Sequence, residues 1–321
     1  MTGTGERTTT PGSPGAGDAV YVESPTEQRN PRTLDIDQLP TLDVLRLIND
    51  EDRTVPEAVA AALPDLARAV DIAVEALHAG GRVHYVGAGT SGRLAVLDAA
   101  ELVPTYNVPP DLFVAHHAGG ERALLRAVEN VEDDAEAGAE AMRRHVTDRD
   151  FVLGLAASGR TPFVLGALAE ARRLGARTGL VSSNPAIRDR VEVDVPIVVD
   201  TGPEAIAGST RMKAGTAQKL VLTAFSTAVM IRRGRTYSNL MVSVVATNAK
   251  LRGRTLRILT EATGLDEQEC SRALAEAGGD LKVALVRLLS GADTERSAAA
   301  LAEADGHVRA ALAALAGSAT A

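Results

Sequence analysis

The stretch of sequence that decides the fold is RVHYVGAGTSGRL, residues 82–94. The β-branched and aromatic residues of 82–86 favour a short strand, and the glycine-rich loop 87–92 follows it directly. A strand that passes through such a loop into a helix is the building unit of open parallel sheets. We therefore expect a strand at 82–86 and then a helix of about ten residues, which ends before Pro104 because proline interrupts helices.

The same unit recurs along the chain. Four further apolar runs, each followed by polar turn residues, are expected to form strands at 111–115, 151–156, 177–181 and 196–199. Helical patterns separate them, and the longest predicts a charged helix over 121–145. Short strands that alternate with helices predict an α/β fold, in which an open parallel sheet has helices on both faces.

The remaining parts of the chain lack this rhythm. Residues 1–19 are rich in Thr, Gly and Pro, have little to bury and are expected to form a disordered tail. The pattern of 20–81 predicts an N-terminal helical segment, and 82–237 holds the α/β domain. Beyond it no strand pattern recurs, so 238–321 is expected to be a C-terminal helical domain, with glycines that delimit a compact piece at about 262–291.

The composition excludes several classes of protein. The 321 residues carry a net charge of −8 and only 2% aromatic residues, which is unlike a nucleic-acid-binding protein. The single cysteine, Cys270, rules out an internal disulfide framework and a thiolate metal cluster. The longest nearly apolar run, Leu220–Ile231, is too short to span a bilayer, and the first thirty residues lack the apolar core of a signal peptide. We expect a soluble, cytoplasmic protein with no membrane partner.

Two adjacent histidines, His116 and His117, follow the second expected strand. On an extended segment their side chains point to opposite sides, and no recognisable ligand set surrounds them. We expect a surface or loop role for them and no bound metal.

Four loops follow the expected strands at the edge of the sheet where ligands bind. They are residues 87–92, 157–161, 182–184 and 201–213, and each contains Ser or Thr. Backbone N–H groups at helix N-termini favour anions, and hydroxyls beside them add hydrogen-bond donors. Together the loops predict a phosphate cradle with room for a polar sugar.

A dinucleotide site is the alternative, because Gly87, Gly89 and Gly92 match the dinucleotide-binding fingerprint. That fingerprint requires an acidic residue about 20 positions further on, at the end of the second strand. Here the second strand ends in Ala-His-His, and Asp111 lies at its beginning. Thr90 also supplies a donor that suits a terminal phosphate, so the pattern favours a monophosphate over a dinucleotide.

Five runs, GAGTSGRL, DAAELVPTY, AASGRTP, SSNP and GSTRMKAGTAQKLVL, in this order and spacing, resemble the N-acetylmuramic acid 6-phosphate etherases of the sugar isomerase (SIS) superfamily. The resemblance extends from about Ser24 to about Leu289. It implies an SIS-type fold and a lyase that removes the D-lactyl ether of N-acetylmuramic acid 6-phosphate, giving N-acetylglucosamine 6-phosphate and D-lactate in peptidoglycan amino-sugar recycling. It implies no cofactor, because the open sugar's own C1 aldehyde acidifies the hydrogen on C2.

The resemblance also implies two catalytic carboxyl groups, Glu101 in DAAELVPTY and Glu132 in AVENVEDD. Glu101 is expected to be the acid that protonates departing lactate, and Glu132 the base at C2. The plain alternative is that both are solvated helix charges. Asp98 and Glu129, each three residues earlier, would share their helical faces.

Substrate contacts are expected from the loops. The phosphate is expected to contact Thr90, Ser91, Ser158, Arg160 and Thr161. Further contacts are expected from Ser209, Thr210 and Arg211, and Glu204 is expected to hold a sugar hydroxyl.

A homodimer is expected as well. Glu101 lies nine residues beyond Gly92, roughly 13 Å along a helix at about 1.5 Å per residue, which strains a direct reach to the sugar. A second subunit that completes the pocket would resolve this, as the dimers of the superfamily suggest. Residues 262–291 resemble a small three-helix module of ubiquitin-associated type, expected to serve as a packing or lid element.

Two other functions are compatible with the same cradle. One is another SIS enzyme, such as a sugar-phosphate isomerase. The other is a non-catalytic sugar-phosphate sensor, in which the loops bind but the glutamates do no chemistry.

Overall fold

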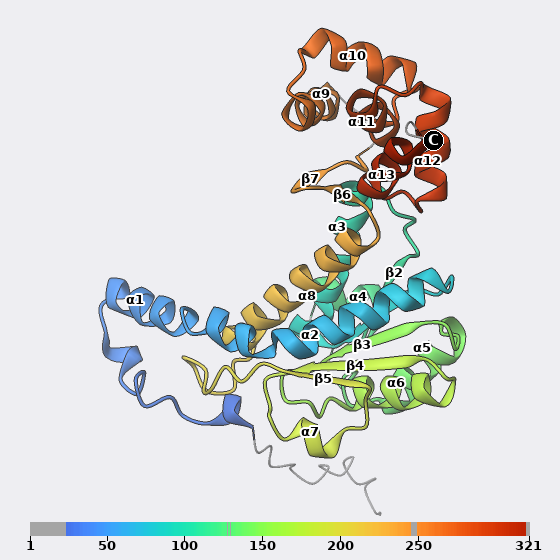
Figure 1. Cartoon of the computed structure of the whole chain (residues 1–321). Coiled ribbons are helices and arrows are strands. Elements are labelled where there is room, and N and C mark those ends of the chain that lie inside the picture. The colour runs from blue at the N-terminus through green and yellow to red at the C-terminus, as the bar shows by residue number, and fades with distance from the viewer. Residues whose placement is uncertain (1–23, 127, 129, 245–248, 319–321) are drawn as a thin grey trace, which may run out of the picture.

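The computed structural model describes residues 24–126, 128, 130–244 and 249–318. An α/β body lies in the middle, a helical arm extends from it at the N-terminal side, and a cluster of helices follows it at the C-terminal side (Figure 1).

The body is built on a five-stranded parallel sheet in the order β2-β1-β3-β4-β5. Its strands are β1 (Val83–Gly87), β2 (Phe113–His117), β3 (Phe151–Leu155), β4 (Arg177–Ser182) and β5 (Val195–Val198). Gly87, at the end of β1, pairs with His117 on one side and with Leu155 on the other. The chain passes from β1 to β2 in one direction across the sheet and from β3 to β4 in the other. The topological switch point, where open α/β sheets bind ligands, therefore lies between β1 and β3.

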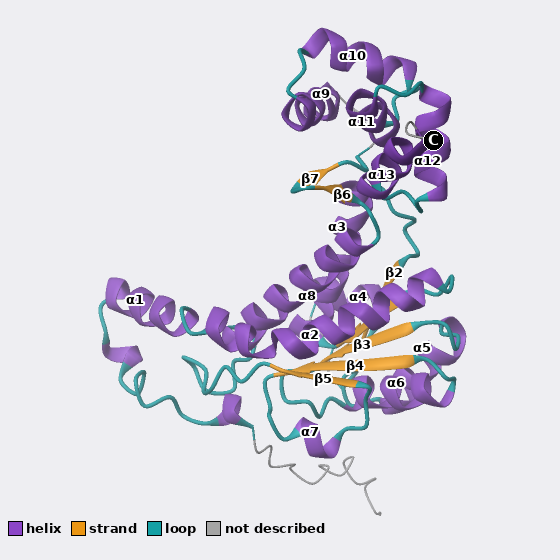
Figure 2. Ribbon diagram, in the orientation of Figure 1, coloured by secondary structure: helices purple, strands orange, loops and turns teal. Residues whose placement is uncertain are grey.

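Helices cover both faces of the sheet, which confirms the predicted fold class (Figure 2). One face packs against α2 (Val55–His78), α3 (Gly89–Tyr106) and α8 (Lys213–Arg232). The other packs against α5 (Ala135–His145) and α6 (Pro162–Arg173). Two further short helices are α4 (Gly120–Leu125) and α7 (Ile187–Arg190). Because side chains alternate along a strand, Tyr85 of β1 joins the first core and Val86 the second.

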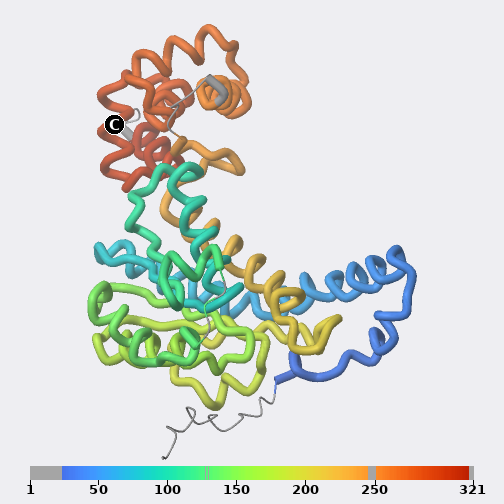
Figure 3. The backbone as a smooth tube through the Cα atoms, turned by 180° about the vertical axis from the view of Figure 1, so that it is seen from behind, coloured from blue at the N-terminus to red at the C-terminus, as the bar shows by residue number. Residues whose placement is uncertain are grey.

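Two short 3-10 turns, η1 (Pro25–Glu27) and η2 (Ile36–Gln38), lead into α1 (Thr41–Asp52). The helix α1 extends from the body, as the view from behind also shows (Figure 3). Its side chains Leu42 and Leu45 are 57% and 58% exposed.

The C-terminal part has a core of its own. It begins with a small hairpin, β6 (Thr236–Tyr237) and β7 (Leu240–Met241), followed by α9 (Ala249–Thr263), α10 (Glu267–Glu276), α11 (Leu281–Ser290), α12 (Thr294–Glu303) and α13 (Val308–Ser318). Asp266, Asp280 and Asp293 cap α10, α11 and α12 through their side chains. The helices thus extend beyond the compact piece expected at 262–291, and the domain boundaries stay a prediction.

The prediction of one helix over 121–145 is wrong. The helix α4 ends at Leu125, and α5 begins only at Ala135, because Asp134 accepts a hydrogen bond from the N–H of Ala137 (2.8 Å) and so starts a new helix. Glu132 therefore lies on an irregular segment, while Glu129 lies outside the described residues.

The prediction that the helix after the glycine-rich loop ends before Pro104 is also wrong, since this helix, α3, continues to Tyr106. Pro104 falls in its last turn, where Leu102 and Tyr106 are buried and hold the backbone in place. Asn107, in the left-handed region with φ 49°, ends the helix instead. The β6–β7 hairpin is a further difference from the all-helical pattern expected after residue 237.

The histidine pair was expected at the surface or in a loop, and this is wrong. Both residues belong to β2, and His117 is buried. Nδ1 of buried His84 lies 2.9 Å from Nε2 of His116. Burial, with His84 and His145 nearby, lowers the pKa of His116 to about 3. No group of three or more His, Cys, Asp or Glu side chains that could hold a metal ion occurs among the described residues.

The helix α8 is long and apolar enough to cross a membrane by length and composition alone. However, 56% of its apolar window is buried inside the structure, where it packs against α2 and α3. It is the central helix of the first core.

Candidate active site

The glycine-rich loop joins β1 to α3 at the switch point. A Cβ on Gly87 would lie 2.7 Å from the nitrogen of Gly92, and one on Gly92 would lie 2.6 Å from both the oxygen of Gly87 and Cδ2 of His117. Strand and helix approach so closely that only glycine fits at either position. Gly89 has φ +53° and open space where a Cβ would lie. The first turn of α3, which carries Thr90 and Ser91, therefore presents its N–H groups at an uncrowded loop.

The second loop, between β3 and α6, is held in shape by the loop after β4. Ser182 donates a hydrogen bond from Oγ to the oxygen of Ala157 (3.0 Å), and Nδ2 of Asn184 donates to the oxygen of Ser158 (2.9 Å). Ser182 and Asn184 are buried. Loop 182–184, which is expected to help bind phosphate, thus stabilises the backbone of the neighbouring loop 157–161.

The residues that this support presents are partly exposed. Oγ of Ser158 accepts a hydrogen bond from the N–H of Arg160 (3.2 Å). Thr161 is the N-cap of α6, but its side chain makes no capping bond. Ser158, Arg160 and Thr161 are therefore all at the sheet edge where the sequence placed them.

A cavity of about 200 Å³ opens beside the glycine-rich loop. It is lined by Ala88 and Gly89 of the loop, by Arg93 of α3 and by Glu132, among others. Glu132 is exposed, and its backbone oxygen accepts a hydrogen bond from the N–H of Phe163 (3.0 Å) at the start of α6. A carboxyl group and two helix N-termini thus meet near this cavity.

Arg93 was not singled out from the sequence. Its Nε donates to the oxygen of Leu124 (2.9 Å), and its Nη2 donates to the oxygen of Ala123 (2.7 Å). The guanidinium therefore holds the end of α4 against α3. The only available signal was an arginine directly after the loop glycine, which does not indicate a partner.

The last loop, 201–213, meets the first. A Cβ on Gly215 would lie 3.4 Å from both the oxygen of Thr210 and Cγ2 of Thr90. The structure therefore brings Thr90 and Thr210 to the same place. Ser209 and Thr210 are partly exposed and Arg211 is exposed.

Glu204 lies in this loop but is fully buried. Its Oε2 accepts a hydrogen bond from the N–H of Lys213 (2.8 Å), and its Oε1 accepts one from the N–H of Ala214 (3.0 Å), so the carboxylate caps α8. Burial raises the pKa of Glu204, against the effect of these two N–H groups. Its contact with a sugar hydroxyl stays a prediction, and one that this burial disfavours.

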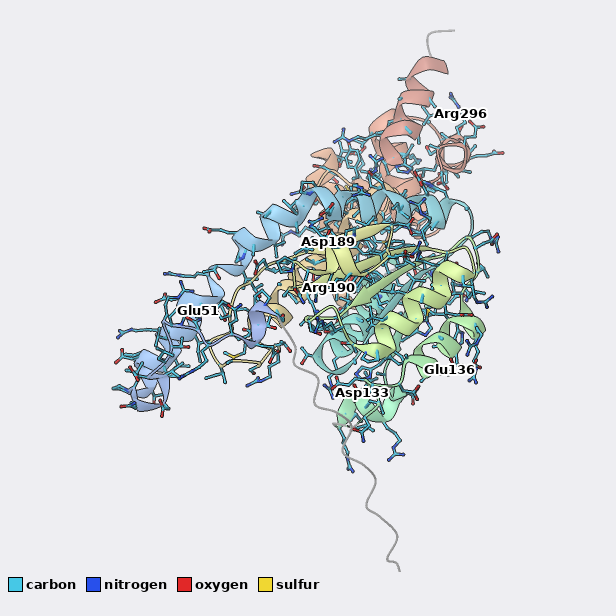
Figure 4. The ribbon with its side chains drawn as sticks, turned by 90° about the horizontal axis from the view of Figure 1, so that it is seen from below. Glu51, Asp133, Glu136, Asp189, Arg190 and Arg296 are labelled. Atoms are coloured by element: carbon cyan, nitrogen blue, oxygen red, sulfur yellow. The ribbon has the colours of Figure 1, made fainter. Side chains whose placement is uncertain are left out.

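Lys213 forms a buried ion pair that fixes the same loop. Its Nζ lies 2.8 Å from Oε2 of Glu51, and both side chains are 2% exposed. Glu51 lies near the end of α1, on the helical arm (Figure 4). Arg32 donates from Nε to the other oxygen of Glu51 (2.6 Å). Burial alone would raise the pKa of Glu51, but the hydrogen bonds from Arg32 and Lys213 outweigh it and lower the pKa.

The N-terminal segment 24–33 is bound to loop 201–213 as well. The N–H of Gly208 donates to the oxygen of Thr26 (2.9 Å), and Oγ1 of Thr33 donates to the oxygen of Ala205 (2.8 Å). Segment 24–33 thus packs along loop 201–213 and holds its backbone in place.

Glu101 lies away from the cavity at the glycine-rich loop. It is exposed on α3 and lines a groove of about 370 Å³ between α3 and α8, together with Asp98, Lys219 and several leucines. Glu132 is not among the residues of this groove, and Glu101 is not among those of the other cavity. Within one chain, the structure does not bring the two predicted catalytic glutamates into one cavity.

These features define the class of the protein. The body is a five-stranded parallel sheet with hydroxyl-bearing loops at its switch point, and residues 65–172 match the family model described as the glucokinase regulatory protein N-terminal SIS domain. The α/β fold is therefore of SIS type. A solved phosphoheptose isomerase from Francisella tularensis aligns with 60% of this chain and 100% of its own, at 21% identity and a TM-score of 0.49.

Curated relatives define the family within this class. A protein of Thermobifida fusca (strain YX) named N-acetylmuramic acid 6-phosphate etherase is 63% identical over 84% of this chain and 88% of its own length. A protein of the same name from Symbiobacterium thermophilum is 53% identical over 83% of this chain and 88% of its own length. The chain belongs to the N-acetylmuramic acid 6-phosphate etherase family, and the predicted resemblance is confirmed.

Proposed function

We propose that this protein cleaves the D-lactyl ether of N-acetylmuramic acid 6-phosphate, which yields N-acetylglucosamine 6-phosphate and D-lactate and serves the recycling of peptidoglycan amino sugars. The observation that carries this proposal is the identity of 63% to a relative with that name, over 84% of this chain and 88% of the relative. The cavity between the glycine-rich loop and Glu132 supports it.

The phosphate would be held at the switch point. The N-termini of α3 and α6 face this edge of the sheet, where their N–H groups and dipoles favour an anion. The contacts that we propose come from Thr90, Ser91, Ser158, Arg160 and Thr161, with Ser209, Thr210 and Arg211 on the other side.

The chemistry needs two proton-transfer groups. With the sugar open, Glu132 takes the proton from C2, and the electron pair of that bond forms the C2–C3 double bond. The C3–O bond breaks, and Glu101 protonates the departing lactate oxygen. Glu101 then takes a proton from water as the hydroxide adds to C3, and Glu132 returns its proton to C2. No redox step occurs.

A homodimer would bring these two groups together. Since Glu101 and Glu132 belong to separate cavities of one chain, we propose that the groove between α3 and α8 faces the sugar cavity of a second copy. Leu97, 56% exposed at this groove, is an apolar side chain that such a partner would cover. We place this dimer in the cytoplasm, since a single cysteine leaves no internal disulfide to maintain.

The test is an incubation of the purified protein with N-acetylmuramic acid 6-phosphate, in which released D-lactate is measured enzymatically. We expect the wild-type protein to release D-lactate. We expect Glu101→Gln to abolish this release but still to bind the sugar phosphate. Binding without release by the unaltered protein would identify a sensor, and conversion of an aldose phosphate to a ketose phosphate without lactate would identify an isomerase. Either result would contradict the proposal.

A further inference from the structure

Asp98 lies in the same groove as Glu101 and on the same face of α3. The two residues are three positions apart, so their side chains are neighbours on the helix surface. Unlike Glu101, Asp98 is only partly exposed and is tied to other parts of the body.

Two hydroxyl groups donate to the Asp98 carboxyl group. The hydroxyl of Tyr85 in β1, fully buried, lies 2.9 Å from Oδ2, and Oγ of Ser226 in α8 lies 3.1 Å from Oδ1. One side chain of α3 thereby joins the helix to the sheet and to α8. Each of the two oxygens accepts a bond, as a carboxylate allows, whereas protonation would turn one of them into a donor and change this arrangement.

The surroundings of Asp98 make its ionisation sensitive to pH. Burial raises its pKa to about 6, although the hydrogen bonds from Tyr85 and Ser226 act to lower it. The ionisable groups facing it are Tyr85 from β1, Glu101 from α3 and Lys219 from α8. From β2, it is the ring of Phe113 that packs against Tyr85, with centroids 5.7 Å apart.

We propose that Asp98 is a positioning residue for the elimination step, and that its carboxylate, bound by Tyr85 and Ser226, fixes the turn of α3 that presents Glu101 to the departing lactate. This inference rests on the proposed function of Glu101. When Asp98 gains a proton, one oxygen becomes a donor that faces another hydroxyl, and at least one of the two bonds is lost or reversed. Turnover then falls, while the phosphate loops that bind the sugar are unaffected.

These bonds predict how each variant changes kcat and its pH dependence. Asp98→Asn removes the titrating group, so we expect kcat to fall about tenfold, KM to change less than about twofold, and the acid limb of kcat near pH 6 to disappear. Tyr85→Phe removes a hydrogen bond that favours the carboxylate, so the acid limb moves up by roughly one pH unit. Ser226→Ala moves it in the same direction.

The experiment measures kcat and KM for D-lactate release from pH 5 to 8.5 in the wild type and the three variants. Asp71→Asn, an exposed aspartate on α2, is the matched control and keeps the wild-type profile. Thermal unfolding of each variant shows whether it is folded. An acid limb that persists in Asp98→Asn, or that does not move in Tyr85→Phe, overturns the inference.

A second measurement does not depend on activity. The carboxyl carbon resonance of Glu101, followed by NMR, is expected to show an inflection near pH 6 that is absent in Asp98→Asn and shifted upward in Tyr85→Phe. If the wild type releases no lactate but this inflection is present, the proposed function fails and the coupling of Asp98 to Glu101 stands. Without the inflection in the wild type, Asp98 does not position Glu101.

Discussion

Glu101 and Glu132 lie at two separate cavities of one chain, although the proposed reaction uses both. Glu101 lines the groove between α3 and α8, Glu132 lines the cavity at the glycine-rich loop, and the two sets of lining residues have no member in common. The helix α3 connects the two places, since it begins at the loop and carries Glu101 along its length.

This separation predicts complementation between subunits. Glu101→Gln and Glu132→Gln are each expected to lower D-lactate release at least about 100-fold. When the two variants are mixed after gentle unfolding and refolding, half of the dimers are hybrids, and each hybrid has one intact site out of two. Activity should therefore return to roughly a quarter of the wild type. Mixtures that stay inactive would show that each site uses both glutamates of one chain.

Ser158→Ala is expected to weaken binding of the sugar phosphate. The lost hydrogen bond to a charged group costs about 1.5–3 kcal/mol, or about 10- to 150-fold in affinity. Isothermal titration calorimetry with N-acetylglucosamine 6-phosphate measures this directly. Ser271→Ala, an exposed serine on α10, serves as the control and should bind like the wild type. Equal affinity of both variants would remove Ser158 from the site.

Glu51→Gln is expected to destabilise the fold by about 3–5 kcal/mol, because Lys213 is left as a buried charge without its partner. Urea unfolding measures the loss, and Glu57→Gln on the exposed side of α2 is the control. The double variant Glu51→Leu, Lys213→Met should recover most of the stability. If it does not, the two side chains do more than neutralise each other.

The pKa of Glu51 also predicts a pH dependence of stability. Since its pKa in the folded state lies below the ordinary glutamate value, the ionised carboxylate favours folding at neutral pH. That contribution is lost as the pH falls through the ordinary range of a glutamate towards the lower folded value. Urea unfolding of the wild type should therefore weaken in this acid range more steeply than that of Glu51→Gln. Parallel curves would contradict the assignment.

Gly92→Ala tests the close approach of strand and helix. A Cβ there would lie 2.6 Å from the backbone oxygen of Gly87, and backbone cannot move aside without cost. We expect a loss of about 1–3 kcal/mol in the free energy of unfolding and a large fall in sugar-phosphate affinity. Gly253→Ala, in α9 with open space around it, should instead leave affinity unchanged and stabilise slightly.

The sheet could be predicted from the sequence because each strand is a short apolar run with a polar loop after it. Such patterns are local, and β1 through β5 begin and end within about two residues of the expected positions. The prediction of one helix over 121–145 failed because its charged pattern is continuous. The interruption comes from the N-cap of Asp134 together with contacts of Arg93 and Phe163 with distant backbone.

The contacts that shape the site are largely beyond sequence patterns. Glu51 and Lys213 are 162 positions apart, and Asp98 and Ser226 are 128 apart, so nothing local indicates that either pair meets. Glu204 illustrates the converse. A polar residue in a ligand-facing loop suggests a ligand contact, whereas in the fold its carboxylate caps α8.

The binding of residues 24–33 to loop 201–213 limits how far the chain can be shortened. Three hydrogen bonds, from Asn30, Thr33 and the N–H of Gly208, cross between the two segments. A truncation that begins at residue 34 would therefore remove the segment that holds loop 201–213 in place. A shortened version of the protein for crystallisation should keep all residues from Ser24 onward.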